Sequence, residues 1–464
     1  MLSKFISLLF ILLFFANPVF VKAQRNAPNV KPYDTTWEGE IFIEDNITIE
    51  EGTILTIKPG TNIKFSRKFN RNPVLLIEGE LKACGTKDNM IIFTGLTGLP
   101  SGWEGIVFSD TSNGEVRYCK IINGNFGINC DKASPLISNN IFTGCVAGIN
   151  IERESRPVIR ENIFEKNLYG IKCDSGCTPL VIDNTFKSNT ESGITYQSGA
   201  LPTIISNNFI ENKSGILAVR PQSSPLISFN NFNSNTYGIL FMQDAGADID
   251  NCVFTKNKFG VLCSMMAKTR LINCLFKEND NAIYGKIWCY FKVEFCDIID
   301  NKIGIGLYLA SNTEITRNNI FNNEIGVEAI LTSPNIDWNN MDNKFNIKIH
   351  KVSIDSAKRR GDKIQIFAPK FNWFGENTAK EIKNGKINLS TFWDYYDSPL
   401  EFDRGTMVQM NKINYEELQK KKIEDCGIRE YIKKSSEELN ASIIEKNKWQ
   451  CNTNVLKGKE VLNQ

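Results

Sequence analysis

The 464-residue sequence has very little histidine and almost no net charge. His350 is its single histidine, which argues against chemistry based on imidazole groups and against conventional zinc sites. Lysine and arginine number 54 against 52 aspartates and glutamates. A near-neutral chain has no general electrostatic attraction to nucleic acid, so we exclude nucleic acid as the expected partner.

Long apolar runs are also missing, apart from one at the start of the chain. Lys4 precedes an apolar run from Phe5 to Ala16. The sequence Val21-Lys22-Ala23 follows, and its last residue is small. This pattern is typical of a secretory signal peptide, so we expect residues 1–23 to be removed and the protein to be secreted or periplasmic. Cleavage removes Lys4 and Lys22 and no acid, so the formal charge falls from +2 to 0. No later run could form a transmembrane segment.

Helical periodicity is missing from residues 37–110, where short β-type runs alternate with turn residues. Ile47-Thr-Ile49, Leu55-Thr-Ile57 and Ile91-Ile-Phe93 are examples, and Pro59-Gly60 is one of the turns. This part of the chain is therefore predicted to be rich in strands.

A phrase of close to 22 residues recurs along most of the sequence. In one copy Asn162, Phe164, Asn167 and Gly170 are its fixed points. The glycine position is occupied, at intervals of 21 to 23 residues, by Gly105, Gly127, Gly148, Gly170, Gly193, Gly215, Gly238, Gly260, Ala282, Gly304 and Gly326. Such a period fits β-solenoids and leucine-rich repeats, and the Leu-x-x-Leu-x-Leu frame of the latter is absent.

Stacking the copies places like residues in columns about 4.8 Å apart, the spacing of neighbouring strands. One apolar row comprises Val116, Ile137, Ile159, Val181, Ile204, Ile227, Ile249, Leu271, Val293 and Ile315. A second comprises Ile121, Phe142, Phe164, Phe186, Phe209, Phe232, Phe254, Phe276, Ile298 and Ile320. We predict that both rows point inward and form one continuous core.

A polar row lies between the two apolar rows: Cys119, Asn140, Asn162, Asn184, Asn207, Asn230, Cys252, Cys274, Cys296 and Asn318. Asparagine at a corner of the coil tolerates left-handed backbone and can bond the same residue one coil away. The cysteines of this row, with Cys130, Cys173 and Cys263, are predicted to be reduced residues that fill the core. A disulfide between Cys426 and Cys451 in the tail is an alternative that the sequence leaves open.

Several phrases resemble those of a known family. Leu55–Thr61, Gly79–Thr86, Trp103–Phe108 and Asn372–Gly375 are similar to segments of secreted right-handed parallel β-helix proteins with the pectate-lyase-like superfold. The repeat also resembles that of NosD-like periplasmic proteins. We predict an all-β, right-handed parallel β-helix with a short helical C-terminal tail. Its first coils would span residues 24–110, its regular repeats and closing coil 111–400, and the charged, mainly helical tail 401–464.

Charged side chains could line a groove for a glycan. Lys132, Arg153 and Arg220 share the position five residues after the glycine, and Asp244, Asp248 and Asp250 fall in one coil. The resemblance implies a polysaccharide lyase or glycoside hydrolase acting on an acidic glycan as one possibility, although the Asn-x-Asp, Gly-Asp-Asp and Gly-His-Gly phrases of polygalacturonases are absent. The alternative is that these six residues are ordinary solvated loop charges.

Two further groups allow a functional or a structural interpretation. Exposed Trp103, Trp288, Tyr290 and Tyr308 could stack on sugars, or pack at the edges of coils. Cys263, Met242, Met265 and Met266 are soft ligands, and the NosD resemblance implies a copper-handling accessory role.

We identify no complete catalytic motif, metal site or cofactor site in the sequence. The favoured interpretation is therefore a monomeric extracytoplasmic scaffold or glycan-binding surface, whose partner is a polysaccharide or a cell-envelope glycan. The lyase or hydrolase and the copper accessory remain as alternatives, because a fold does not by itself imply a function.

Overall fold

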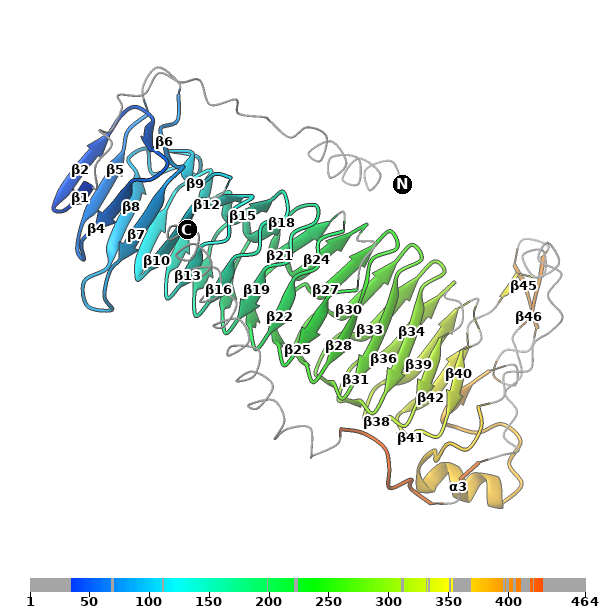
Figure 1. The fold of residues 1–464 in the computed structure, drawn as a ribbon. Helices are drawn as coiled ribbons and strands as arrows, with labels where there is room; N and C mark the ends of the chain where they lie inside the picture. The colour runs from blue at the N-terminus through cyan, green and yellow to red at the C-terminus, as the bar shows by residue number, and fades with distance from the viewer. Residues whose placement is uncertain are drawn as a thin grey trace, which may run out of the picture.

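The computed structural model describes residues 35–67, 71–110, 112–197, 199–220, 224–309, 313–330, 332, 334–349, 352–353, 369–394, 397, 400–403, 406–409, 418–419 and 421–428. Three parallel sheets of 14, 14 and 15 strands run along it, here called A, B and C (Figure 1). Each coil contributes one strand to each sheet in that order. The predicted parallel β-solenoid is confirmed.

The strands of sheet A are β1 (Thr35–Trp37), β4 (Ile54–Ile57), β7 (Glu80–Cys84), β10 (Asn113–Arg117), β13 (Leu136–Ser138), β16 (Val158–Arg160), β19 (Leu180–Ile182), β22 (Thr203–Ile205), β25 (Leu226–Ser228), β28 (Gly246–Asp250), β31 (Lys268–Ile272), β34 (Tyr290–Glu294), β37 (Glu314–Thr316) and β40 (Asn335–Asp337). Those of sheet B are β2 (Glu40–Ile43), β5 (Asn62–Phe65), β8 (Ile91–Gly95), β11 (Cys119–Ile122), β14 (Ile141–Thr143), β17 (Ile163–Glu165), β20 (Thr185–Lys187), β23 (Asn208–Ile210), β26 (Asn231–Asn233), β29 (Val253–Thr255), β32 (Leu275–Lys277), β35 (Asp297–Ile299), β38 (Asn319–Phe321) and β41 (Asn340–Asp342).

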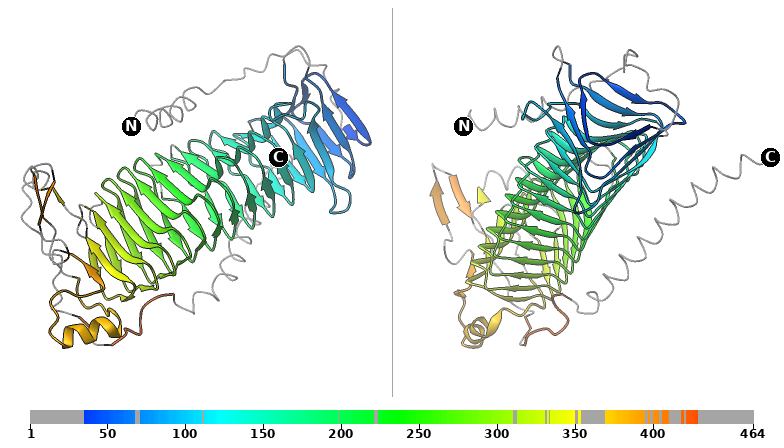
Figure 2. Two further views of the ribbon diagram at one scale, coloured as in Figure 1. Left: turned by 180° about the vertical axis from the view of Figure 1, so that it is seen from behind. Right: turned by 90° about the vertical axis from the view of Figure 1, so that its left-hand side faces the viewer.

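Sheet C contains β3 (Ile47–Ile49), β6 (Val74–Ile77), β9 (Gly105–Phe108), β12 (Phe126–Asp131), β15 (Ala147–Glu152), β18 (Tyr169–Cys173), β21 (Ser192–Gln197), β24 (Ser214–Val219), β27 (Tyr237–Met242), β30 (Phe259–Ser264), β33 (Asn281–Lys286), β36 (Ile303–Tyr308), β39 (Ile325–Ile330), β42 (Phe345–Ile349) and β44 (Phe392–Trp393). Figure 2 shows the coils stacked along one axis, from the blue N-terminal coils to the yellow C-terminal ones.

The core consists of the two predicted apolar rows, and every residue of both rows is buried. From Phe142 to Phe276 seven phenylalanine rings stack face to face, with centroids 4.6 to 4.9 Å apart. The glycine row is needed for close approach: a Cβ on Gly148 would lie 2.7 Å from both the Gly170 carbonyl oxygen and Cδ1 of Phe164. The core thus extends through the array as predicted.

Asparagines form a ladder at each of two corners. At the corner between sheets A and B, Oδ1 of Asn162 accepts the backbone N–H and the side-chain amide of Asn140, at 2.9 and 3.0 Å. Nδ2 of Asn162 donates to the carbonyls of Ile137 and Arg160. At the corner between sheets B and C the same bonds link Asn167, Asn189, Asn212, Asn235, Asn257, Asn279, Asn301, Asn323 and Asn343.

Asparagine was expected at these corners because it tolerates left-handed backbone, but the left-handed residue is the one before it. The left-handed φ belongs to the residue before each asparagine, such as Glu161 (56°) before Asn162 and Lys166 (55°) before Asn167. The asparagine itself is buried, because its side chain must reach the carbonyls and amides of two coils at once. The residue before it, such as the exposed Glu161, makes the turn.

Three thiols interrupt the ladder between sheets A and B. Cys252, Cys274 and Cys296 are fully buried, and each sulfur lies 3.2 to 3.3 Å from the carbonyl oxygen two residues earlier, where an asparagine amide would donate. All twelve described cysteines are free, as predicted for the core. Cys426 is among them, whereas Cys451 lies outside the described residues.

The C-terminal end is closed by residues that leave the regular pattern. Among the described residues Asn372 is the last rung of its ladder, Trp373 forms a parallel bridge with Asn340 of sheet B, and helix α3 (Gly375–Lys383) follows. Phe374, Leu389 and Phe392 then cover the end of the core. Strands β43 (Val352–Ser353), β45 (Leu400–Asp403) and β46 (Thr406–Gln409) form a separate antiparallel sheet.

The tail, residues 401–464, was predicted to be mainly helical. Of its described residues, 401–403 and 406–409 belong to the strands β45 and β46. Residues 418–419 and 421–428 contain no helix. They pack along the corner between sheets A and B. The amide of Asn340 donates to and accepts from the backbone of Ile423, at 2.8 and 2.7 Å, and Asp425 pairs with Arg317 at 2.6 Å. The other predicted tail helices, the signal peptide and His350 lie outside the described residues.

Candidate functional site

The outer face of sheet C carries three outward rows. These are the residues one before, two after and four after each glycine position, because the residues between them point into the core. In the N-terminal coils, up to Gln197, the two rows after the glycine are mostly polar, although the row before it includes Phe126 and Tyr169. In the later coils all three rows are mainly aromatic and apolar, with exceptions such as Lys286. We call these two parts the polar half and the aromatic half.

The polar half contains a column of carboxylates, Asp131, Glu152 and Asp174, one on each of three successive coils. Asn150 stands two residues before Glu152, and its Nδ2 donates to Glu152 Oε1 at 2.8 Å and to Asn129 Oδ1 at 3.0 Å. On the next coil, Lys172 lies 3.9 Å from Asp174. This ladder was missed from the sequence, although the glycine alignment places the three acids in register.

Two of the predicted basic residues lie at the edge of this polar half. Lys132 and Arg153 follow the ends of β12 and β15 with left-handed φ angles of 53° and 48°. Lys132 pairs with Asp110 at 3.2 Å, and Arg153 pairs with Asp131. Both cations are therefore largely neutralised by neighbouring carboxylates.

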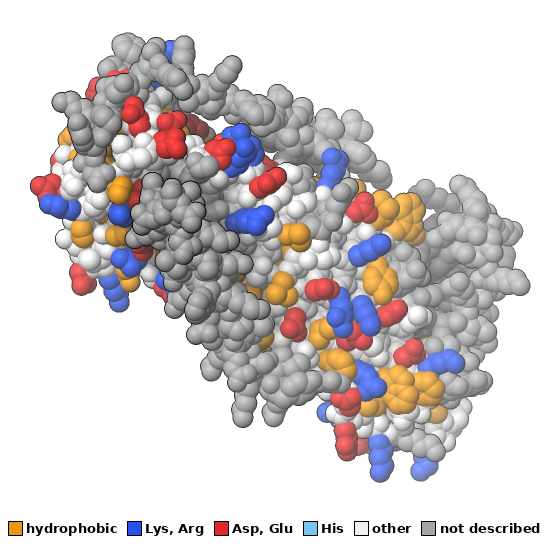
Figure 3. Space-filling view, in the orientation of Figure 1, with side chains coloured by type: hydrophobic (Ala, Val, Ile, Leu, Met, Phe, Trp, Pro, Cys, Tyr) orange, Lys and Arg blue, Asp and Glu red, His pale blue; other side chains and the backbone are white. Residues whose placement is uncertain are grey.

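The third predicted basic residue lies apart from them. Arg220 is three coils beyond Arg153, and its Nε donates to Gln243 Oε1 at 2.5 Å. Figure 3 shows basic and acidic side chains interspersed over the visible face, without a large patch of one sign. The structure thus does not assemble the three into a continuous basic groove.

The three predicted aspartates lie on two surfaces. Asp244 is exposed at the corner after sheet C, next to Gln243, whereas Asp248 and Asp250 point outward from β28 on sheet A. Burial raises the pKa of the Asp250 carboxyl, and Asn273 and Arg270 oppose that rise. The six charged residues predicted from the sequence therefore do not share one groove.

The aromatic half is a ridge on successive coils. The rings of Tyr237 and Phe259 stack at 5.5 Å, and Tyr284 meets Phe259 edge-on at 5.7 Å. Tyr308 follows on the next coil with 36% of its surface exposed, and Trp288 at the edge of the sheet is 63% exposed. The ridge presents aromatic surface to solvent over several coils.

The aromatic residues predicted to stack on sugars thus lie in three different places. Trp288 and Tyr308 belong to this ridge, whereas Trp103 is wholly buried and stacks on Phe65 at 4.0 Å. Tyr290 points outward from sheet A, where burial raises the pKa of its hydroxyl.

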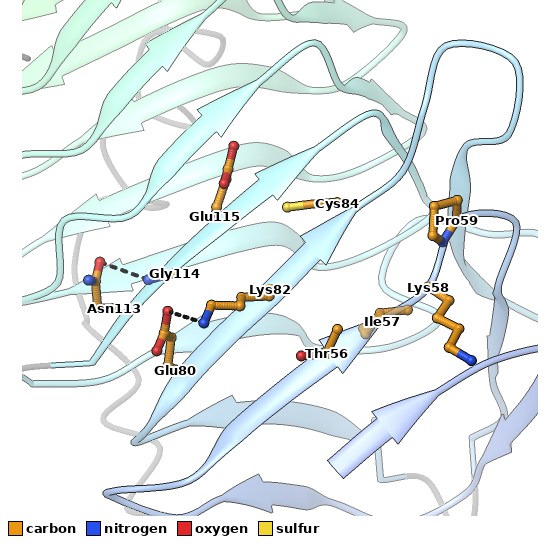
Figure 4. A pocket seen from close by; sticks show the side chains of 10 residues that line it. All are labelled: Thr56, Ile57, Lys58, Pro59, Glu80, Lys82, Cys84, Asn113, Gly114 and Glu115. Carbon is orange, nitrogen blue, oxygen red and sulfur yellow. Dashed lines mark hydrogen bonds and ion pairs between the residues drawn. The ribbon is translucent and has the colours of Figure 1, made fainter. Parts of the chain in front are cut away.

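A shallow cavity of about 420 Å³ lies on another surface, the outer face of sheet A in the N-terminal coils (Figure 4). Glu80 and Lys82 pair at 3.3 Å, and the thiol of Cys84 on the same strand lies towards Glu115. Burial and the neighbouring Glu115 raise the pKa of that thiol, so it is not activated as a nucleophile.

The soft ligands of the copper hypothesis are not brought together. Cys263 points into the core, where its sulfur lies 3.3 Å from the hydroxyl of Thr269, while Met242 points outward and Met266 is exposed. No group of three or more His, Cys, Asp or Glu side chains that could hold a metal occurs among the described residues. Nor does any helix within them have the length and apolar character to span a membrane.

Comparison with known proteins identifies the family to which the fold belongs. No curated protein sequence matches the chain. Among solved structures, a mutant of the periplasmic alginate epimerase AlgG is 14% identical over 61% of this chain and 78% of its own, with a TM-score of 0.39. The unmutated AlgG is also 14% identical, over 75% of each chain, with a TM-score of 0.27. The family model described as "Right handed beta helix region" matches residues 83–232 and 195–347, more than half of the chain. The protein therefore belongs to the right-handed β-helix family.

Proposed function

We propose that this protein is a non-catalytic glycan-binding protein that acts outside the cytoplasm. The observation that carries the proposal is the outer face of sheet C, where a ladder of carboxylates and amides continues into an aromatic ridge on one regular surface. Its binding surface is this face, and its ligand is an extended polysaccharide chain. The sequence pattern of residues 1–23 supports export.

Both halves of the face suit a carbohydrate. Aromatic rings such as Tyr308 and Trp288 offer large, rigid surface for the apolar faces of sugar rings. Carboxylates and amides offer acceptors and donors for hydroxyl groups. Strand spacing of about 4.8 Å repeats these groups along the solenoid axis, which favours a ligand that is itself a repeating chain.

A binding role is favoured over catalysis by how the carboxylates are used. Glycoside hydrolysis needs a paired acid and base that are free to exchange protons at the glycosidic bond. Here Asp131 is paired with Arg153, and Asp174 accepts a hydrogen bond from Gln197 and lies near Lys172. These acids are held in structural contacts.

The test combines a glycan array with calorimetry on the mature chain. We expect Trp288→Ala or Tyr308→Ala to weaken binding of the glycans that score on the array by about tenfold, which corresponds to ~1.4 kcal/mol. The matched control is Phe42→Ala, because Phe42 is an aromatic residue on sheet B that is as exposed (62%) as Trp288. Unchanged affinity in both ridge variants would contradict the assignment of this face.

A product assay separates binding from catalysis. The bound glycans are incubated with the protein and examined for new reducing ends and for unsaturated sugars. We expect neither product. Formation of unsaturated ends would instead identify a polysaccharide lyase, and new reducing ends alone a hydrolase.

A further inference from the structure

We propose that Gly306 is a positioning residue of the glycan-binding face, because it holds the ring of Tyr284 in place within the aromatic ridge, where that ring stacks on a sugar. This inference rests on the proposed glycan binding and adds both residues to the site. It is carried by the space above Gly306 and by the contacts of the ring that fills it.

The backbone gives no reason for a glycine at position 306. Gly306 lies within β36, in the outward row two residues after the glycine position, between Tyr284 and Glu328 of the neighbouring coils. Its φ lies outside the left-handed region. Glycine inside a strand lowers stability, and a β-branched residue would suit the position better. A glycine here therefore needs another explanation.

The ring of Tyr284 supplies that explanation. A Cβ on Gly306 would lie 2.5 Å from Cδ2 and 2.6 Å from Cε2 of Tyr284, so one edge of the ring occupies the space of the missing side chain. The next nearest atom, Cγ2 of Ile303, would lie 3.5 Å away, at ordinary contact distance. Gly304 on the same strand differs, because a Cβ there would lie 2.6 Å from the Gly326 carbonyl oxygen. Gly304 thus serves the packing of the backbone, and Gly306 serves the placement of one ring.

Further contacts restrain the ring in this orientation. It meets the ring of Phe259 edge-on, with centroids 5.7 Å apart and planes at 69°, and Nζ of Lys286 lies 5.6 Å from its centre. Burial raises the pKa of the Tyr284 hydroxyl, and Glu328, two coils beyond, adds to that rise. The ring therefore reaches from its own coil across Gly306 towards Glu328, along the axis of the solenoid.

A ring fixed lengthwise suits a polysaccharide that runs along the same axis. Tyr284 is half-buried, so part of its aromatic surface remains open to a ligand. A ring that is already held in the bound orientation loses little freedom when a sugar stacks on it, which strengthens binding. Any side chain at position 306 would push the ring out of this place.

The experiment is a double-mutant cycle measured by calorimetry on the full mature chain. The probe is a hexasaccharide of the glycan that binds most tightly on the array. We expect Gly306→Val to weaken binding about tenfold without lowering the thermal unfolding midpoint, because valine is favoured in strands. Tyr284→Ala should weaken binding to a similar extent. Adding Gly306→Val to Tyr284→Ala should change the affinity by about twofold or less, since the glycine acts only through the ring.

Gly306→Ala gives the same comparison with a smaller side chain, and circular dichroism verifies that the variants fold. The matched control is Asn208→Val, which places valine at an exposed outward position of sheet B and should bind like the unaltered protein. Unchanged affinity in Gly306→Val, or losses that add up in the double variant, overturns this inference while glycan binding itself stands. If the unaltered protein binds no glycan on the array, the proposed function is overturned as well.

Discussion

Single residues determine how well each rung of the asparagine ladders is bonded. Where Asn230 precedes Cys252, its backbone N–H meets a sulfur at 3.4 Å instead of an amide oxygen near 2.9 Å, as at Asn207. Sulfur is a weak acceptor and the thiol a weak donor. The three thiols therefore preserve the volume of the ladder but weaken its hydrogen bonds.

Restoring the amide should stabilise the protein. Cys252→Asn should raise the free energy of unfolding by about 0.5–1.5 kcal/mol, the typical net value of one hydrogen bond. The reverse change, Asn207→Cys, should lower it by a similar amount. Urea denaturation followed by far-ultraviolet circular dichroism measures both, and Cys130→Ala controls for the loss of a thiol elsewhere in the core. A destabilised Cys252→Asn variant would contradict this account.

Residues that repeat in every coil could be predicted from the sequence, and those that do not repeat could not. The Ile159 row and the Phe164 row were assigned to the core because each recurs ten times. The carboxylate ladder was missed because its row changes to Val219 and Met242 in later coils. The left-handed turn lies at Glu161 and not at Asn162, and it could not be predicted because many different residue types occupy the turn position.

At the scale of elements, the described tail residues show a limit of pattern reasoning. Leu418, Ile423 and Ile428 belong to a series of apolar residues whose loose spacing predicted helices, yet this segment runs without helix across three coils. Long-range bonds override the local pattern: Gln419 donates to Asn372, the backbone of Ile423 pairs with Asn340, and Gly427 donates to Arg317. Such contacts depend on the surface offered by the solenoid.

Breaking one of these contacts should release the segment without unfolding the coils. In Asn340→Leu the two hydrogen bonds to Ile423 are lost, so the amides of Ile423 and Gly427 should exchange with deuterium at least tenfold faster. Exchange in the neighbouring strand β38 should be unchanged. Asn231→Leu, a similar outward asparagine on sheet B far from the tail, is the control. Equal exchange in both variants would show that the segment is held by other contacts.

For the whole molecule, stability comes from contacts between neighbouring coils, as expected for a solenoid. Each strand of the three parallel sheets pairs only with strands of the neighbouring coils. Because the coils are nearly equivalent, a coil should be able to pair, in the same register, with the coil that normally lies two positions further along. This property distinguishes a repeat protein from a globular domain of the same length.

Removing one complete coil should therefore leave a folded protein. Deletion of residues 207–229 joins Ser206 to Asn230, which occupies the position of Asn207 one coil further along the same corner. We expect an unchanged far-ultraviolet spectrum and a cooperative thermal transition close to that of the full chain. Deletion of residues 207–218, about half a coil, should abolish that transition because the inward and outward rows no longer align. Similar behaviour of the two deletions would contradict the equivalence of the coils.

The asparagine ladders also make the molecule directional. Every bonded rung points its amide N–H towards the C-terminal coils and its carbonyl oxygen back, as between Asn167 and Asn189. Aligned dipoles of this kind polarise one another, so a rung gains from those already formed on both sides. One corner carries an unbroken series of such dipoles, and the other is divided by three thiols into two shorter ones. The solenoid is therefore electrically polar along its length, with unequal polarity on its two corners.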